Sequence, residues 1–188
     1  MIVLTENSEI KTRKWEYPYS SLQFSLPKFA AKEIIQWGDD NILDEELYEE
    51  HNLVYGREYE SHVTIVYGIK EESPKQIKKL LSKQKPFYIE CGKVSVFNCD
   101  NFDVLKIEVE SPEIRRIHKL IYDTFDVLPC SFNKYRPHVT IAFLNKTCGD
   151  KFIGNDDFLG NRILVDRLMF SSKDGAQSMI EFEKDSSV

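Results

Sequence analysis

The chain has 188 residues, a formal net charge of −6 at pH 7, and contents of 41% hydrophobic and 30% charged residues. This balance is typical of one globular domain, or of two small halves around a shared core, and it excludes disordered, collagen-like and coiled-coil proteins. The sequence pI of about 5.3 argues against a protein that grips long duplex DNA, because such proteins carry a basic face.

No apolar run approaches ~18 residues, so no transmembrane helix is predicted. The N-terminal sequence Met-Ile-Val-Leu-Thr-Glu-Asn lacks the basic start and the apolar core of a secretory signal, which predicts a cytoplasmic protein. The cysteines form no CxxC pair and show no zinc-ribbon spacing; they are Cys91, Cys99, Cys130 and Cys148. We therefore expect reduced thiols, with neither a metal site nor a cofactor.

The first predicted elements are a strand and a helix. Tyr19–Leu26 alternates apolar and small polar residues, which is typical of a half-buried strand. A helix is expected after Pro27, with an apolar stripe on one face and an end at Gly38. Residues 39–61 are acidic and predict a long loop, with one helical turn around Glu45–Glu50.

The rest of the chain continues with strands, helices that begin at prolines, and turns. The predicted strands are His62–Tyr67, Phe87–Phe97, Phe102–Val109, Pro137–Leu144, Ile163–Phe170 and Ser178–Phe182. Helices are expected after Ser73 and Ser111, because each is followed by a proline that suits a first helical position. The last two strands form a predicted hairpin around Asp174-Gly175, a strong turn signal.

The sequence contains a weak internal repeat of strand, proline, helix, loop and a strand that begins His-Val-Thr-Ile. Its segments are Ser20–Leu26, Phe29–Trp37 and His62–Tyr67 in the first half, and Asp103–Val109, Ile114–Phe125 and His138–Phe143 in the second. Two such α+β lobes that face each other place equivalent residues across a cleft, which is a natural ligand site. We expect one bilobal domain over residues 19–188, preceded by a polar lead-in over residues 1–18.

We expect the catalytic residues in the two identical tetrapeptides, which begin at His62 and His138. Because side chains alternate along a strand, His62 and Thr64 share one face, as do His138 and Thr140, while the Val and Ile residues point to the other. Two histidines, with an unperturbed pKa of about 6.5, suit concerted general base and general acid catalysis. Threonine hydroxyls can donate hydrogen bonds to phosphate oxygens. The pattern predicts a displacement at phosphorus that needs no metal; the alternatives are a shared strand-packing pattern and a site that binds nucleotide without turnover.

These motifs resemble those of the 2H phosphoesterase superfamily, which includes the 2′-5′ RNA ligases and cyclic phosphodiesterases and is defined by two H-x-T/S-x motifs. The segment Tyr135–Ala142 also resembles the context of the family's second motif, and the resemblance covers roughly Tyr19 to Glu183. It implies an α+β bilobal fold, with two pseudo-symmetric lobes of antiparallel sheet, helices on the outer faces and a central cleft. It also implies catalytic roles for four residues, without assigning base and acid: His62, Thr64, His138 and Thr140.

A narrower resemblance is to phage- and prophage-encoded members of this family, some of which degrade cyclic oligonucleotide messengers of bacterial antiviral signalling. The segments that carry it are Tyr19-Ser20-Ser21, Tyr67-Gly68 and Ser172-Lys173-Asp174-Gly175. The sequence therefore predicts a metal-independent phosphodiesterase for a short or cyclic oligonucleotide. The alternatives are an RNA-end 2′,3′-cyclic phosphodiesterase, which predicts a basic groove leading away from the histidines, and a nucleotide-binding module.

Four further residues are candidates for substrate binding: Tyr19, Phe97, Tyr135 and Arg136. The guanidinium of Arg136 either meets a phosphate or forms a surface salt bridge. The three aromatic rings either stack on a base or pack in the core or at its rim. His118 is expected to be structural or exposed, and Lys93 to be solvated.

Overall fold

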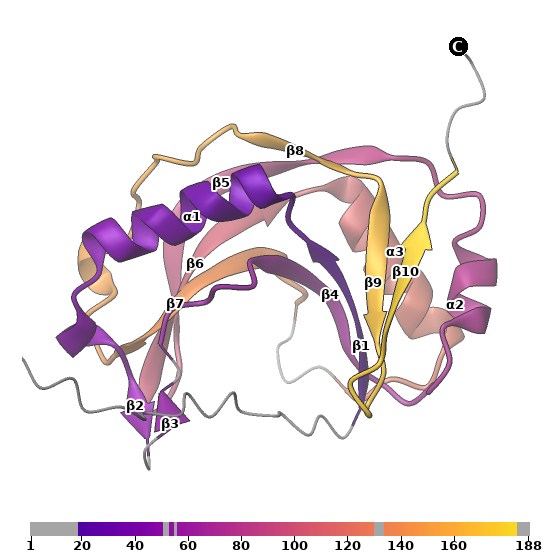
Figure 1. Cartoon of the computed structure of the whole chain (residues 1–188), viewed down its shortest axis with the longest axis horizontal. Helices are drawn as coiled ribbons and strands as arrows, with labels where there is room; N and C mark the ends of the chain where they lie inside the picture. Colours follow the sequence, from indigo (N-terminus) through magenta and orange to yellow (C-terminus); the bar gives the residue numbers. More distant parts are fainter. Residues whose placement is uncertain (1–18, 51–52, 55, 130–133, 184–188) are drawn as a thin grey trace, which may run out of the picture.

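The eight strands of the main sheet lie side by side in a computed structural model that describes residues 19–50, 53–54, 56–129 and 134–183 (Figure 1). The lead-in expected over residues 1–18 lies outside the described residues, as does Cys130. The strands are β1 (Ser20–Ser25), β4 (His62–Ile69), β5 (Phe87–Asn98), β6 (Phe102–Glu110), β7 (His138–Asn145), β8 (Arg162–Val165), β9 (Arg167–Ser171) and β10 (Gln177–Glu181).

The sheet consists of two halves that meet at the strands bearing the repeated motif. The strand order within the described residues is β10-β9-β1-β4-β7-β6-β5-β8, with antiparallel neighbours throughout. β4 and β7 join the halves, and Val63 pairs with Val139 across this junction. Figure 1 shows the sheet curving into an arch with β4 and β7 on its inner side. The predicted fold, two antiparallel lobes with helices outside, is confirmed.

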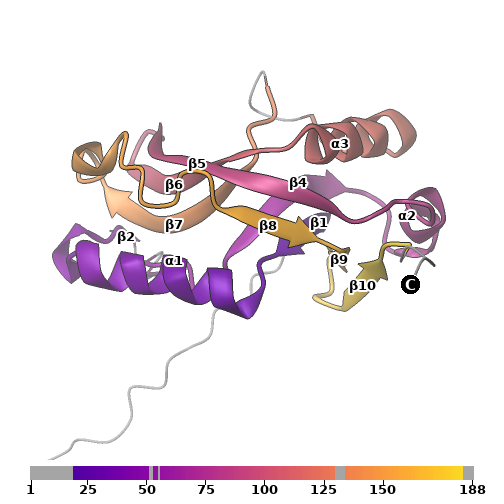
Figure 2. The same ribbon diagram turned by 90° about the horizontal axis from the view of Figure 1, so that it is seen from above.

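Each of the two main helices packs on a strand of the opposite half. The main helices are α1 (Lys28–Asn41) and α3 (Pro112–Thr124), and α2 (Lys75–Leu80) is shorter. α1 follows β1 in the chain but contacts β7, whereas α3 follows β6 but contacts β4. Figure 2 shows α1 and α3 along opposite flanks of the molecule. This exchange of helices ties the two halves together, because each motif-bearing strand contacts the long helix of the other half.

Gly38 lies within α1, so the prediction that it ends the helix is wrong; α1 continues to Asn41. A Cβ at this position would lie 3.3 Å from Cγ2 of Ile141 on β7. Gly38 therefore permits the close approach of α1 to β7.

The core lies between the helices and the outer side of the sheet. β4 and β7 begin with the same burial pattern, in which the histidine and threonine are half-buried and the residues between them are buried. Val63, Ile65, Val139 and Ile141 are at most 2% exposed. The apolar face of α3 adds three fully buried isoleucines: Ile114, Ile117 and Ile121. The alternation predicted for the two motifs thus places their polar residues on the inner side of the arch.

The segment predicted as one strand, Ile163–Phe170, is two strands. β8 pairs with β5 of the second half, and β9 pairs with β1 of the first half. Asp166 lies between them, and its carbonyl accepts a hydrogen bond from Phe182 N at 3.0 Å. The chain crosses here from one half to the other, which the local alternation of residues did not reveal.

The acidic segment after α1 holds more structure than the predicted loop. It forms a short 3-10 helix at Asp44–Glu46 and the strand pair β2 (Glu49–Glu50) and β3 (Leu53–Val54).

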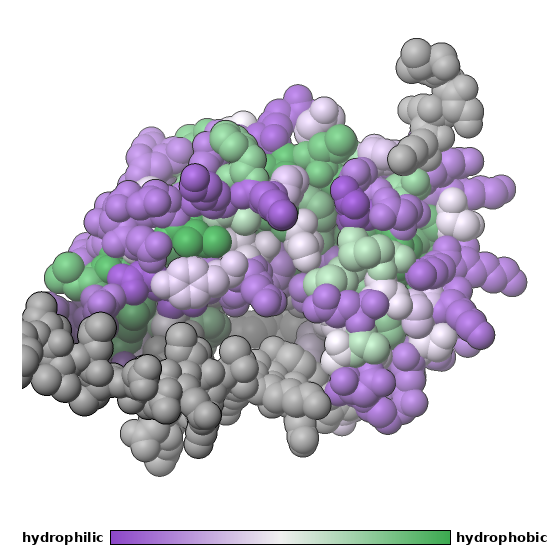
Figure 3. All heavy atoms as spheres, viewed as in Figure 1, coloured by the Kyte–Doolittle hydropathy of each residue, from purple (hydrophilic) through white to green (hydrophobic). Residues whose placement is uncertain are grey.

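Hydrophilic side chains cover most of the face seen in Figure 3, with hydrophobic ones between them. The helices in the described part of the chain are too short or too polar to cross a bilayer.

Cys91, Cys99 and Cys148 are free thiols. Burial, with a smaller contribution from the charge of Glu90, raises the pKa of Cys91 to about 11.

Candidate active site

The two motif histidines are held in the same way. Nδ1 of His62 donates to the carbonyl of Glu60 at 2.7 Å, and Nδ1 of His138 donates to the carbonyl of Arg136 at 2.8 Å. A carbonyl oxygen can only accept, so Nδ1 carries the proton in both rings. Nε2 therefore carries the lone pair in the neutral form of each ring, ready to exchange a proton with a ligand.

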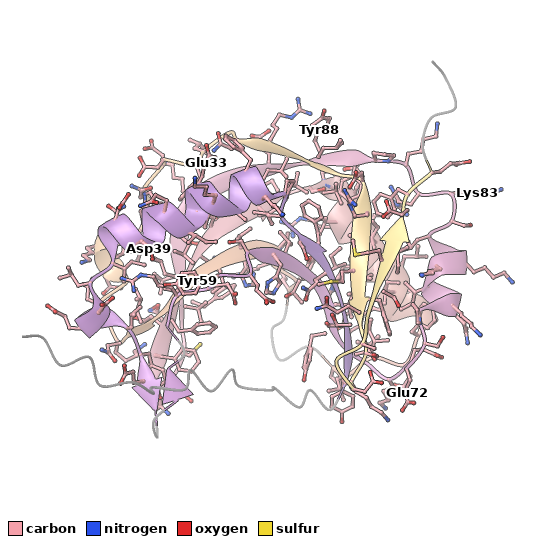
Figure 4. The ribbon with its side chains drawn as sticks, in the orientation of Figure 1. Glu33, Asp39, Tyr59, Glu72, Lys83 and Tyr88 are labelled. Carbon is pink, nitrogen blue, oxygen red and sulfur yellow. The ribbon has the colours of Figure 1, made fainter. Side chains whose placement is uncertain are left out.

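Two cavities adjoin beside the two motif strands. The His62 cavity, of about 700 Å³, is lined by Tyr19, Ser21, Gln23, Glu58, Glu60, His62, Thr64, Tyr67, Thr140, Phe143, Ser171, Ser172 and Gln177. The His138 cavity, of about 430 Å³, is lined by Thr64, Ile65, Val66, Tyr67, Phe97, His118, Tyr122, Leu128, Pro129, Lys134, Tyr135, Arg136 and His138. Thr64 and Tyr67 line both, so one histidine lies on each side of Thr64. Figure 4 shows side chains projecting from the strands toward the inner side of the arch, while the labelled Glu33 and Asp39 lie on α1.

Thr64 and Thr140 lie in the same place on their strands and are half-buried. Both line the His62 cavity, and neither hydroxyl has a hydrogen-bond partner among the described residues. Hydroxyl groups in such a position are available to an anionic ligand between the two histidines. The structure therefore gathers all four residues predicted to be catalytic around one place.

Lys106 on β6 lies beside this site, and the sequence analysis missed it. Its side chain is 4% exposed; Nζ donates to Ser95 Oγ at 2.6 Å and lies 3.8 Å from a Glu108 carboxylate oxygen. Nζ also lies 4.1 Å from the centroid of the Phe97 ring, which meets the His138 ring edge to face with centroids 5.0 Å apart. Lysine is rarely buried, so a lysine inside an apolar strand was the available signal.

The surroundings favour the neutral form of His138. Burial lowers the pKa of His138 most, and the positive charges of Lys106 and His62 lower it further. The hydrogen bond to the Arg136 carbonyl acts in the opposite direction. Because an ordinary histidine has a pKa of about 6.5, His138 is mainly neutral at pH 7 and can accept a proton.

Tyr135 and His118 tie the segment before His138 to the strand that bears His62. The Tyr135 hydroxyl donates to the Thr64 carbonyl at 2.9 Å, and His118 Nδ1 donates to the Ile65 carbonyl at 2.7 Å. The two rings stack with centroids 3.8 Å apart and an interplanar angle of 4°. His118 is thus structural, and one face of the Tyr135 ring is covered by the protein.

The other predicted binding residues lie on different sides of the site. Tyr19 lines the His62 cavity, whereas Phe97, Tyr135 and Arg136 line the His138 cavity. Arg136 is exposed, and it forms no ion pair with a described residue. No group of three or more histidine, cysteine or acidic residues able to hold a metal ion occurs in the described part of the chain.

Comparisons with solved structures show that the fold is known. The Thermus thermophilus protein TT0787 aligns with a TM-score of 0.59 and 11% identity over 87% of this chain and 95% of its own. Escherichia coli LigT complexed with 3′-AMP gives a TM-score of 0.55 and 12% identity over 88% of this chain and 94% of its own. Kluyveromyces marxianus Usb1 gives a TM-score of 0.54 and 11% identity over 87% of this chain and 97% of its own. At these identities the likeness establishes the fold.

A search of curated protein sequences found no match. The family model of the 2′-5′ RNA ligase superfamily matches residues 52–152, more than half of the chain, and this region includes both His-Val-Thr-Ile motifs. The chain therefore belongs to the 2′-5′ RNA ligase superfamily, which confirms the resemblance to 2H phosphoesterases that its two motifs carry.

Proposed function

We propose that this protein is a metal-independent phosphodiesterase that cleaves a short or cyclic oligonucleotide, acting as a single cytoplasmic domain. The observation that carries the proposal is the position of Thr64 between two cavities, with His62 lining one and His138 lining the other. A phosphate bound at Thr64 and Thr140 would have an imidazole on each side. Displacement at phosphorus needs a base on the attacking side and an acid on the leaving side, and this arrangement supplies both.

The surroundings of His138 support a division of roles. His138, whose pKa is lowered, takes the proton from the attacking hydroxyl group, which is a ribose 2′-OH or water. The new oxygen–phosphorus bond forms as the bond to the leaving oxygen breaks, and protonated His62 gives its proton to that oxygen. Thr64 and Thr140 donate hydrogen bonds to the non-bridging oxygens, which gain charge in the transition state. Exchange of protons with water then restores both histidines.

The size of the site supports a substrate with a nucleoside on each side of the phosphate. The two adjoining cavities have volumes of about 700 and 430 Å³, within the usual range for small-molecule sites. Solved structures with this fold include LigT complexed with 3′-AMP or with NADP+ and Usb1 with uridine monophosphate, which favours a small nucleotide here. A cyclic oligonucleotide messenger of antiviral signalling is the substrate we propose to test first.

The second candidate is an RNA-end 2′,3′-cyclic phosphodiesterase. Lys134 and Arg136 on the rim of the His138 cavity favour it, because an RNA chain extending from the site would present further phosphates to them. Both candidates use the same four residues, so substrate choice separates them.

The test is a product assay in the presence of EDTA. The wild type, His62→Ala and His138→Ala are each given cyclic di- and trinucleotides, 2′-5′ oligoadenylate and 2′,3′-cyclic mononucleotides, and circular dichroism checks that the variants fold. We expect cleavage of cyclic oligonucleotides by the wild type and a loss of roughly 10²–10⁴-fold in each variant. Cleavage of 2′,3′-cyclic ends alone would move the function to RNA ends. Nucleotide binding without turnover of any substrate would contradict the enzyme proposal.

A further inference from the structure

The two halves of the site differ at the positions that neighbour the motif threonines. Gln23 on β1 is the cross-strand partner of Thr64, and Lys106 on β6 is the cross-strand partner of Thr140. β1 and β6 hold equivalent places in the sheet, each beside its motif strand and each followed by a main helix. Gln23 and Lys106 therefore occupy equivalent positions, one uncharged and one cationic.

A row of uncharged polar residues extends from β1, the strand of Gln23, across β9 to β10, the edge strand of the first half. Ser21 pairs with Tyr67 on β4 and with Ser171 on β9, and Ser171 pairs with Gln177 on β10. All of these residues line the His62 cavity. With strands spaced about 4.8 Å apart, the row from β1 to β10 is about 10 Å long.

The serine and glutamine side chains of this row have hydrogen-bonding capacity that the described residues do not use. The side chains of Ser21, Gln23, Ser171 and Gln177 form no hydrogen bond with any described residue. Ser21, Gln23 and Ser171 are also half-buried. Half-buried polar groups in a cavity are satisfied by water or by a ligand, and a ligand that replaces that water must offer its own donors and acceptors.

The charges around the His62 cavity disfavour a further phosphate. The described residues that line it include Glu58 and Glu60 but no lysine or arginine. Lys134 and Arg136 line the His138 cavity instead. A second phosphate of the substrate is therefore attracted to the His138 side and repelled from the His62 side.

We propose that the row of Ser21, Gln23, Ser171 and Gln177 is a nucleobase-binding subsite, which holds the nucleoside on the His62 side of the scissile phosphate. The proposal deepens the phosphodiesterase function proposed above. A primary amide both donates and accepts, so Gln23 and Gln177 can pair with the edge of a nucleobase, as side-chain amides do with adenine. Gln23 lies beside Thr64, where it meets the part of the nucleoside nearest the phosphate.

Calorimetric titration tests the subsite without requiring turnover. The probes are the 5′-monophosphates of adenosine, guanosine, cytidine and uridine, because the nucleoside on the leaving, His62 side is joined to the phosphate through its 5′ oxygen. Inorganic phosphate is the probe that lacks a nucleoside. The proteins are the wild type, Gln23→Leu and Gln177→Leu, with Gln76→Leu as a matched control at an exposed position on α2. Because the two glutamines lie on different strands, a folding defect in one variant still leaves the other variant to test the subsite.

We expect at least one nucleoside 5′-monophosphate to bind the wild type more tightly than inorganic phosphate does. Gln23→Leu and Gln177→Leu should weaken that binding by roughly 5- to 50-fold, while phosphate binding stays unchanged and Gln76→Leu resembles the wild type. The subsite is overturned if nucleotides bind no better than phosphate, or if both variants bind nucleotide as the wild type does. A variant enzyme that still cleaves substrate with unaltered nucleotide affinity overturns the subsite alone, whereas weakened binding in a protein that cleaves nothing overturns only the enzyme proposal.

Discussion

The ammonium group of Lys106 lies 4.1 Å from the centroid of the Phe97 ring, on the inner side of the arch. Phe97 in turn touches the imidazole of His138. One aromatic ring therefore separates the buried positive charge of Lys106 from His138, the proposed base. Titratable groups near His138 include Lys106 and Glu108 from β6, His62 from β4 and Arg136 from its own segment. The charge of Lys106 is one of the causes that lower the pKa of His138.

Replacing Lys106 with methionine should therefore raise the pKa of His138. A larger fraction of His138 would then be protonated near pH 6 and unable to accept a proton, so the acid limb of the kcat/KM profile moves to higher pH. We expect activity at pH 6 to fall by roughly three- to tenfold, with a smaller change at pH 8. The measurement is kcat/KM between pH 5 and 9.

Two control variants separate this electrostatic effect from lost packing. Lys106→Arg keeps the charge and should keep the acid limb in place, and Lys93→Met removes an exposed lysine from β5. An acid limb that stays unmoved in Lys106→Met would show that Lys106 does not act on His138.

The two motif strands and the bilobal sheet were predictable from the sequence, because local alternation places His62 and Thr64 on one face and repetition does the same for His138 and Thr140. The positions of Gln23 and Lys106 beside the motif threonines were not predictable in this way. They follow from the register between strands, and local periodicity does not determine register.

Two other features depend on contacts between distant segments. The sequence leaves Tyr135 open to stacking on a base, but its hydroxyl and one ring face contact Thr64 and His118, which are 71 and 17 positions away. The crossing of the chain at Asp166 from β8 to β9 carries no proline or glycine signal, so the pattern predicted a continuous strand. In both places the structure depends on contacts between distant segments, which the local sequence pattern does not show.

The threonine hydroxyls should contribute mainly to the transition state. Thr64→Val and Thr140→Val keep the β-branched shape that suits a strand but remove the donor. We expect kcat to fall by roughly 10²–10³-fold in each, with little change in KM, because the phosphate oxygens gain charge as the reaction proceeds. Steady-state kinetics checks this, and Thr→Ser at each position should retain most of the activity. A change confined to KM would mean that the hydroxyls only bind the ground state.

Tyr135→Phe should loosen the connection between the two halves. The variant leaves the Thr64 carbonyl without its donor while keeping the ring stacked on His118. We expect the free energy of unfolding to fall by about 1–2 kcal/mol, measured by urea denaturation. Tyr88→Phe, at an exposed tyrosine on β5, is the matched control and should leave stability unchanged. Equal stability of Tyr135→Phe and the wild type would count against this hydrogen bond as a tie between the halves.

Gly68 sits at the end of the first motif strand, where Leu128 crosses close to the backbone. Its φ is +92°, and an added Cβ would lie 2.9 Å from Leu128 Cβ. Gly68→Ala therefore adds a steric clash, worth about 1–3 kcal/mol, to the left-handed strain of about 1–2 kcal/mol. Gly154→Ala is the matched control, because Gly154 has a φ of +87° and no atom within 4 Å of an added Cβ. Urea denaturation should show a larger loss of stability for Gly68→Ala; equal losses would mean that the Leu128 segment moves aside without cost.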